Sequence, residues 1–105
     1  MDVFDIFIAY VDWEGGGKSR PVLIIGRKED VLMVFKITTQ YEDKSEAIRK
    51  NYFKIIDWRE AGLKQQSYVD TNSYRNLPKI AWKDKTPTGT LSETDIQRLL
   101  KFLTP

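Results

Sequence analysis

The sequence contains no cysteine and no histidine among its 105 residues. Without cysteine the chain can form no disulfide, no thiolate metal ligand and no cysteine nucleophile, which fits the reducing cytoplasm where we expect the protein to reside. Without histidine it can form neither a histidine acid–base pair nor a metal site that contains histidine. Any chemistry must therefore use carboxylate, guanidinium, ammonium, hydroxyl or phenol groups.

The sequence also lacks an apolar run approaching the roughly 20 residues that span a bilayer. Its start, MDVFDIF, has no basic segment of the kind that begins a signal peptide. We therefore expect neither a membrane association nor export. The net charge is only +2, from 17 Lys and Arg against 15 Asp and Glu. That value is too small to indicate nucleic-acid binding, so any basic surface must be local.

What the sequence does contain predicts one globular domain over residues 1–105. Apolar residues make up 41% and charged residues 30% of the chain, which is typical of a folded domain, and no linker or repeat divides it. Short runs rich in β-branched and aromatic residues predict strands. These strands are expected at residues 5–11, 20–26, 31–39, 52–56 and 67–71, with residues 78–82 leading into another. Both faces of the first strand are apolar, as for a strand that is covered on two sides.

Two polar segments are expected to have other structures. DWEGGGKS, residues 12–19, predicts a loop because consecutive glycines lose much entropy in a regular element. DWREAGL predicts a single helical turn, with Asp57 as its N-cap and Gly62 as its terminator.

The last segment predicts a C-terminal helix. Ser92 and Asp95 have the spacing of a capping box. Apolar residues then follow at helical spacing and predict one buried stripe, formed by Ile96, Leu99, Leu100 and Leu103. Closely spaced strands followed by a lone helix predict a mainly β fold, a small β-barrel with a C-terminal helix.

Arg20 is the first candidate binding residue. It begins a strand directly after Lys18 and a glycine-rich segment, so its guanidinium would lie beside backbone N–H groups that can approach an anion. Taken alone, it is equally a surface arginine at the end of a loop. Arg59 and Arg75 have no comparable setting and are expected to be solvated.

The segment KITTQ supplies polar groups at the end of a predicted strand. The hydroxyl of Thr38 or Thr39 can hold a phosphate oxygen or a ribose hydroxyl, and Gln40 follows them. Threonine is also an ordinary strand residue, which leaves both interpretations open. Tyr41 and Trp13, in predicted loops, are the aromatic residues best placed to stack on bases.

Glu14 and Asp70 are candidate carboxylates, although each is equally expected to be an ordinary solvated side chain. No carboxylate cluster has the spacing of metal ligands, so we predict no metal and no cofactor.

Taken in order, these stretches resemble the MazF/PemK family of toxins from type II toxin–antitoxin systems. The resemblance extends from Asp5 to Leu103, over DIFIAYV, the glycine-rich loop, RPVLII, ITTQ, AGL, SYVD, IAW and GTLSETD. It implies an SH3-like β-barrel that forms a homodimer and cleaves single-stranded RNA, including mRNA, without a metal. It also implies a cognate antitoxin whose C-terminal segment docks over the RNA-binding groove.

The resemblance assigns roles to individual residues. The family's catalytic arginine precedes a proline at the start of the second strand and matches Arg20, and its catalytic threonine matches Thr38. Glu14 is the nearest equivalent of an acidic residue in the glycine-containing loop, and Asp70 matches an acidic residue near a later strand. Other members use a loop histidine, which this chain lacks.

The implied reaction is attack of a ribose 2′-hydroxyl on the adjacent phosphorus. Arg20 would stabilise charge on the non-bridging oxygens, since a guanidinium stays charged and presents a fork of donors. Thr38 would orient the phosphate or the attacking hydroxyl, while the base is Glu14, Asp70 or neither. Lys18, Thr39 and Gln40 are expected to contact RNA. The alternative is a toxin of the same fold, or a degenerate member, that binds a protein partner without cleaving RNA.

Overall fold

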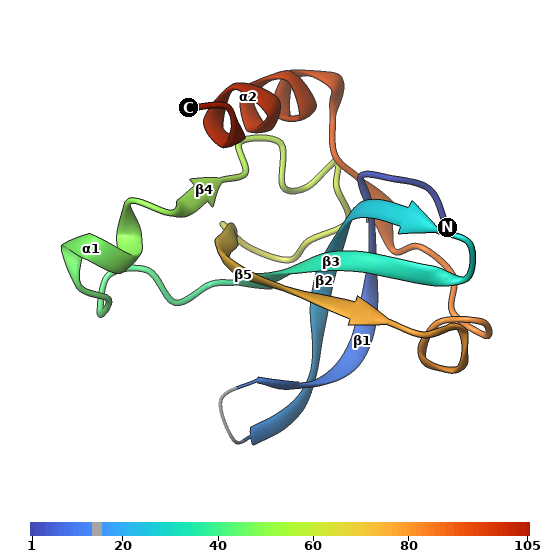
Figure 1. Cartoon of the computed structure of the whole chain (residues 1–105). Coiled ribbons are helices and arrows are strands. Elements are labelled where there is room, and N and C mark those ends of the chain that lie inside the picture. Colours follow the sequence, from blue (N-terminus) through green and yellow to red (C-terminus); the bar gives the residue numbers. More distant parts are fainter. Residues whose placement is uncertain (14–15) are drawn as a thin grey trace.

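The structure is a computed structural model that describes residues 1–13 and 16–105. It is mainly β, with a six-stranded antiparallel sheet and a helix at the C-terminal end (Figure 1). The strands are β1 (Asp5–Trp13), β2 (Gly16–Lys28), β3 (Val31–Thr38), β4 (Tyr52–Lys54), β5 (Tyr68–Leu77) and β6 (Gly89–Thr90). The helices are α1 (Glu46–Arg49), the 3-10 helix η1 (Lys79–Ala81) and α2 (Glu93–Leu103).

The strands are arranged in the order β4-β5-β3-β2-β1-β6. In the part of the chain that the structure describes, no pairing joins β4 to β6, so the sheet is open. The mainly β class and the C-terminal helix predicted from the sequence are confirmed, whereas hydrogen bonding does not close the sheet into a barrel. No helix of the described residues is long and apolar enough to cross a membrane.

The β1–β2 hairpin is longer than the sequence predicts. The two strands pair from Ile6↔Leu23 as far as Trp13↔Gly16, so the predicted loop is wrong for residues 12–13 and 16–19, while residues 14–15 lie outside the described part of the chain. The backbone N–H and C=O groups of the two paired strands hydrogen-bond to each other whatever the side chains are. The glycines therefore do not interrupt the pairing here. The ring of Tyr10 lies over Gly17, where a Cβ would collide with the Tyr10 hydroxyl.

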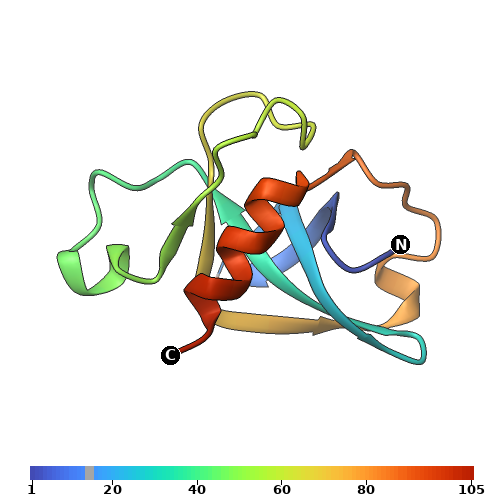
Figure 2. The same ribbon diagram turned by 90° about the horizontal axis from the view of Figure 1, so that it is seen from above.

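The central residues of β1, β2 and β3 are buried on both faces of the sheet. In β1, Ile6 packs into one apolar cluster while its neighbour Phe7 packs into the other, because successive side chains point to opposite faces. Helix α2 lies across the first face, as Figure 2 shows from above. The first cluster consists of Ile6, Leu23, Phe35, Ile37, Phe53, Ile55, Ala61, Val69, Leu91 and Leu99. The second consists of Phe7, Ala9, Val22, Ile24, Leu32, Val34, Leu77 and Trp82.

Helix α2 begins where the sequence predicts. The Ser92 hydroxyl oxygen accepts a hydrogen bond of 3.1 Å from the backbone N–H of Asp95. Leu99 is fully buried and Ile96 packs against the first cluster. Leu100 and the other apolar residues near the helix end remain exposed, so the buried stripe is narrower than predicted.

The carboxylate of Asp95 fastens α2 to the segment after β4. It is fully buried and accepts hydrogen bonds from the backbone N–H groups of Ile56 and Asp57, at 3.2 and 2.8 Å. Nη1 of Arg98 donates a third bond, at 2.6 Å. A buried carboxylate is stable only when its lone pairs are occupied in this way.

One local prediction is confirmed in part and another is wrong. Residues 57–63 form a single hydrogen-bonded turn, in which the backbone N–H of Ala61 donates to the carbonyl oxygen of Asp57 at 3.1 Å, while the Asp57 carboxylate accepts a bond from the Ser92 hydroxyl. Gly62 does end this segment, with a φ of +80° that favours glycine. Residues 78–82 contain η1 and no strand, and Trp82 donates through Nε1 to the carbonyl oxygen of Asp30 at 2.9 Å.

Substituting Asp95 tests the role of this buried carboxylate. In Asp95→Asn an amide NH₂ replaces one acceptor oxygen and faces a donor, so we expect the free energy of unfolding to fall by about 2–4 kcal/mol. Urea denaturation followed by circular dichroism measures the change. Asp84→Asn, at an exposed carboxylate, is the control and should change it by less than about 0.5 kcal/mol. Equal effects of the two substitutions would contradict the assignment.

Candidate polar site on the second face of the sheet

The face that carries the second cluster becomes polar toward one end of its strands. Arg20 pairs with Ala9 and lies two residues before Val22, and both of these belong to the second cluster. Because side chains alternate along a strand, Arg20 lies on the same face as these two residues. The strand start predicted for Arg20 is instead an interior position of β2, and its side chain is half-buried.

The neighbouring strands continue this polar surface. Lys36 pairs with Val22 on β2 and with Asp70 on β5, and Thr38 pairs with Tyr68. The β2–β3 register ends at Val22↔Lys36, and its continuation by two residues sets Arg20 opposite Thr38. We call these five residues, Arg20, Lys36, Thr38, Tyr68 and Asp70, the polar face.

An irregularity in β5 places Asp70 beside Lys36. Phe35 pairs with Tyr74, but the next residue, Lys36, pairs with Asp70, so residues 71–73 have no partner in the ladder. A bulge of this kind redirects the side chains next to it. Asn72 lies in the bulge and donates to Asp70 Oδ1 through its backbone N–H at 2.9 Å and through Nδ2 at 3.0 Å. Asp70 Oδ2 lies 3.6 Å from Lys36 Nζ.

A cavity of about 280 Å³ opens beside this ion pair. Its charged lining comprises three cations, Lys36, Lys44 and Arg75, against the single carboxylate of Asp70. Arg75 is half-buried here, so the prediction that it is simply solvated is wrong. The cavity is lined by Lys36, Lys44, Ile48, Tyr52, Asp70, Asn72, Ser73 and Arg75. It therefore suits an anion with hydrogen-bonding groups.

Arg20 and Thr38 share the polar face with Lys36 but are not among the residues that line this cavity. Nε of Arg20 is buried and has no hydrogen-bond partner among the described residues. A buried donor left without a partner costs about 1–3 kcal/mol, and more when it is charged. Native structures rarely leave such a donor without an acceptor, which a bound water, an ion or a ligand can supply. The arginine is thus arranged to receive an acceptor such as a phosphate oxygen.

Tyrosines border the polar face near Thr38. The rings of Tyr41 and Tyr68 are stacked with their centroids 4.3 Å apart, and the guanidinium of Arg49 lies 5.4 Å from the Tyr41 centroid. Burial raises the pKa of Tyr68 above its ordinary value of 10.0, and the adjacent Tyr41 and Glu42 raise it further. The Tyr68 phenol therefore remains neutral and can donate a hydrogen bond. Tyr41 was predicted to be available for stacking, but Tyr68 already occupies one face of its ring.

The remaining predicted residues are distributed differently. The Thr38 hydroxyl oxygen accepts a bond of 3.0 Å from the backbone N–H of Gln40, which is itself exposed. Thr39 lines a separate cavity of about 500 Å³ with Ile8 and Pro21, so the structure separates it from Thr38. Lys18 is exposed on β2. Glu14 and the side chain of Trp13 lie outside the part of the chain that is described.

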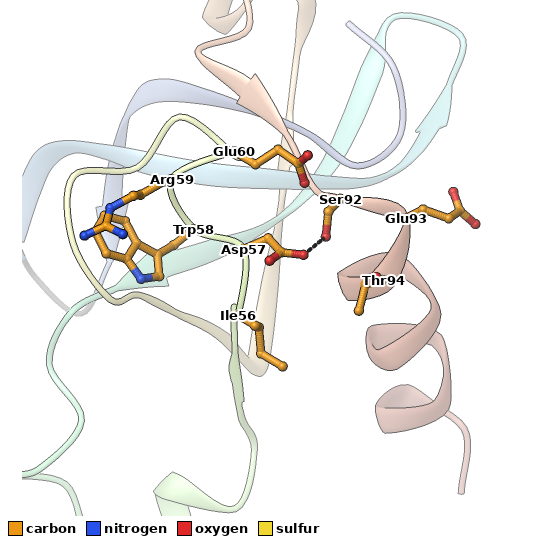
Figure 3. Close-up of a pocket in the computed structure, with 8 residues that line it drawn as sticks. All are labelled: Ile56, Asp57, Trp58, Arg59, Glu60, Ser92, Glu93 and Thr94. Carbon is orange, nitrogen blue, oxygen red and sulfur yellow. Dashed lines mark hydrogen bonds between the residues drawn. The ribbon is translucent and has the colours of Figure 1, made fainter.

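A larger cavity, of about 570 Å³, lies where α2 begins (Figure 3), and none of the five residues of the polar face lines it. It is lined by Ile56, Asp57, Trp58, Arg59, Glu60, Ser92, Glu93 and Thr94. Its charged lining is three carboxylates against one arginine, Arg59, whose guanidinium lies 4.6 Å from the Trp58 ring centroid. This acidic cavity would repel a polyanion. Within residues 1–13 and 16–105, no group of three acidic residues is placed to hold a metal ion.

Sequence reasoning missed Lys36, Arg75 and Tyr68 as members of the site. Lys36 was the one visible signal, since a charged residue stands within the otherwise apolar run VLMVFKI. Such a residue on a strand buried on both faces needs a partner, which the sequence alone did not identify.

Comparison of the chain with protein-family models found no match, and a search among curated proteins found none either.

The raised pKa of Tyr68 predicts how stability changes in alkali. Because the folded chain holds this proton to a higher pH than the unfolded chain, the free energy of unfolding should fall as the pH rises above 10.0. Tyr68→Phe should make this fall shallower. Urea denaturation of both proteins at a series of pH values measures it, and parallel curves would contradict the prediction.

Proposed function

We propose that the protein is a toxin of the MazF/PemK type that cleaves single-stranded RNA without a metal ion. The observation that carries the proposal is the buried Nε of Arg20, which lacks a partner among the described residues and shares a face with Thr38. A phosphodiester supplies the acceptor that this donor needs. The excess of cations in the adjacent cavity supports a polyanionic substrate.

In the proposed reaction the ribose 2′-oxygen attacks the adjacent phosphorus and the bond to the 5′-oxygen breaks. Arg20 donates to the non-bridging oxygens, on which negative charge develops. The Thr38 oxygen already accepts from Gln40, so its O–H remains able to donate to a phosphate oxygen. Both groups are fixed on adjacent strands of one sheet, and fixed positions of this kind supply much of the rate in the absence of strong acids and bases.

The finer description of the fold belongs to the same proposal. We interpret the curved open sheet with its C-terminal helix as a partly open form of the SH3-like barrel of these toxins. A homodimer would bring two polar faces together, and the disordered C-terminal segment of an antitoxin would compete with RNA for them. That segment would be acidic, because it must satisfy Arg20 and the lysines of the cavity.

Replacing Arg20 tests the proposal. Arg20→Ala should lower the rate of RNA cleavage by at least about 10²-fold, as expected when a donor to a developing oxyanion is lost. It should also abolish growth arrest on expression, while circular dichroism shows an unchanged fold. Arg59→Ala removes an exposed arginine from the acidic cavity and is the matched control. Full toxicity of Arg20→Ala without RNA cleavage would favour the alternative, a toxin that acts by binding a protein.

The type of chemistry has its own test. Cleavage of a single-stranded RNA should continue in EDTA at an unchanged rate and leave 2′,3′-cyclic phosphate and 5′-hydroxyl ends, because the 2′-oxygen is the nucleophile. Mapping the ends of the products after cleavage with and without chelator provides the measurement. Loss of activity in EDTA, restored by a divalent cation, would overturn the metal-independent mechanism.

A further inference from the structure

We propose that Lys36 is the proton donor to the 5′-oxygen leaving group and that Asp70 is the residue that positions it. This inference rests on the proposed function, and it identifies an acid for a reaction that must proceed without histidine.

The position of Lys36 is the first argument. Lys36 lies on β3 two residues before Thr38, so the two side chains share the polar face. Lys36 pairs with Val22 on β2. Arg20 lies two residues before Val22 on the same face, so Arg20 and Lys36 are diagonal neighbours. Such neighbours lie roughly 7–8 Å apart at the backbone, a span that two long side chains bridge easily. One phosphodiester can therefore contact both.

The environment of Lys36 is the second argument. Only 15% of its side chain and 12% of that of Asp70 are exposed, and Nζ lies 3.6 Å from Asp70 Oδ2. The other carboxylate oxygen, Oδ1, is held by two bonds from Asn72. Asp70 thus has a fixed orientation and holds the Lys36 ammonium by an ion pair. An ammonium carries three donors.

The chemistry of the other groups is the third argument. Arg20 stays protonated and is a poor general acid. The pKa of Tyr68 is raised by burial, which makes its phenol a weaker acid than an ordinary tyrosine. Thr38 is a weaker acid still. Among the groups that form the polar face, the Lys36 ammonium is the acid that is held by an ion pair with a carboxylate.

In the proposed step, the bond from the 2′-oxygen to phosphorus forms as the bond from phosphorus to the 5′-oxygen breaks. The electron pair of the broken bond passes to the 5′-oxygen. Lys36 Nζ gives that oxygen a proton and becomes a neutral amine. The proton released by the 2′-hydroxyl passes to solvent, and Lys36 regains a proton from solvent before the next turnover.

A substrate with sulfur in place of the 5′-bridging oxygen tests the inference, because a thiolate leaves without being protonated. With ordinary RNA, Lys36→Met and Lys36→Arg should each lower kcat by about 10²-fold or more, the usual contribution of a general acid. With the 5′-thio substrate, the same variants should cleave within about threefold of the unsubstituted protein, since the lost proton is no longer needed. Asp70→Asn should show a smaller defect on ordinary RNA and the same rescue by sulfur.

Lys44→Met is the matched control. Lys44 lines the same cavity, but among the described residues it forms no ion pair with a carboxylate. It should lower cleavage of both substrates by the same factor, as loss of a binding charge does. Lys36 variants that are equally slow on both substrates would overturn the inference, and so would a Lys36→Arg variant with full activity on ordinary RNA. Absence of any RNA cleavage by the unsubstituted protein would instead refute the proposed function itself.

Discussion

The burial of both faces of β1, β2 and β3 is the constraint on which the rest of the structure depends. A side chain at the centre of these strands has little access to water, because one face lies under α2 and the other under Trp82 and its neighbours. Polar residues on the second face therefore need partners within the protein or from a ligand. Lys36 has Asp70, whereas Arg20 Nε has no partner among the described residues. The candidate site is thus the part of the sheet where a buried polar group lacks a hydrogen-bond partner among the described residues.

Two irregular features make that constraint compatible with a small sheet. Residues 71–73, which have no partner on β3, let β5 follow β3 while moving Asp70 into reach of Lys36. The buried carboxylate of Asp95 joins α2 to the segment after β4 by accepting two backbone bonds and one from Arg98. The first feature forms the site, and the second keeps a helix over the opposite face. In both features the oxygens of a buried carboxylate accept from backbone N–H groups and from side chains.

Local sequence patterns predicted what depends on local interactions. The start of α2 was predictable because the cap joins Ser92 to Asp95, three residues apart. The extent of the β1–β2 hairpin was not, since pairing between two backbones overrode the weak strand propensity of glycine. The polar face was predicted only at Arg20, Thr38 and Asp70. The positions of its remaining members depend on strand register and on the bulge in β5. Tertiary packing determines both, so no short stretch of sequence predicts them.

The small net charge of the chain conceals a separation of charge between two regions. The cavity beside the polar face has three cations and one carboxylate in its lining, whereas the cavity where α2 begins has three carboxylates and one arginine. Opposite local charges of this kind orient an approaching polyanion even when the total is only +2. In the proposed function, this separation of charge would draw an RNA strand toward Arg20 and Lys36 and keep it from the start of α2. Salt would weaken this attraction, because screening acts mainly on exposed charges.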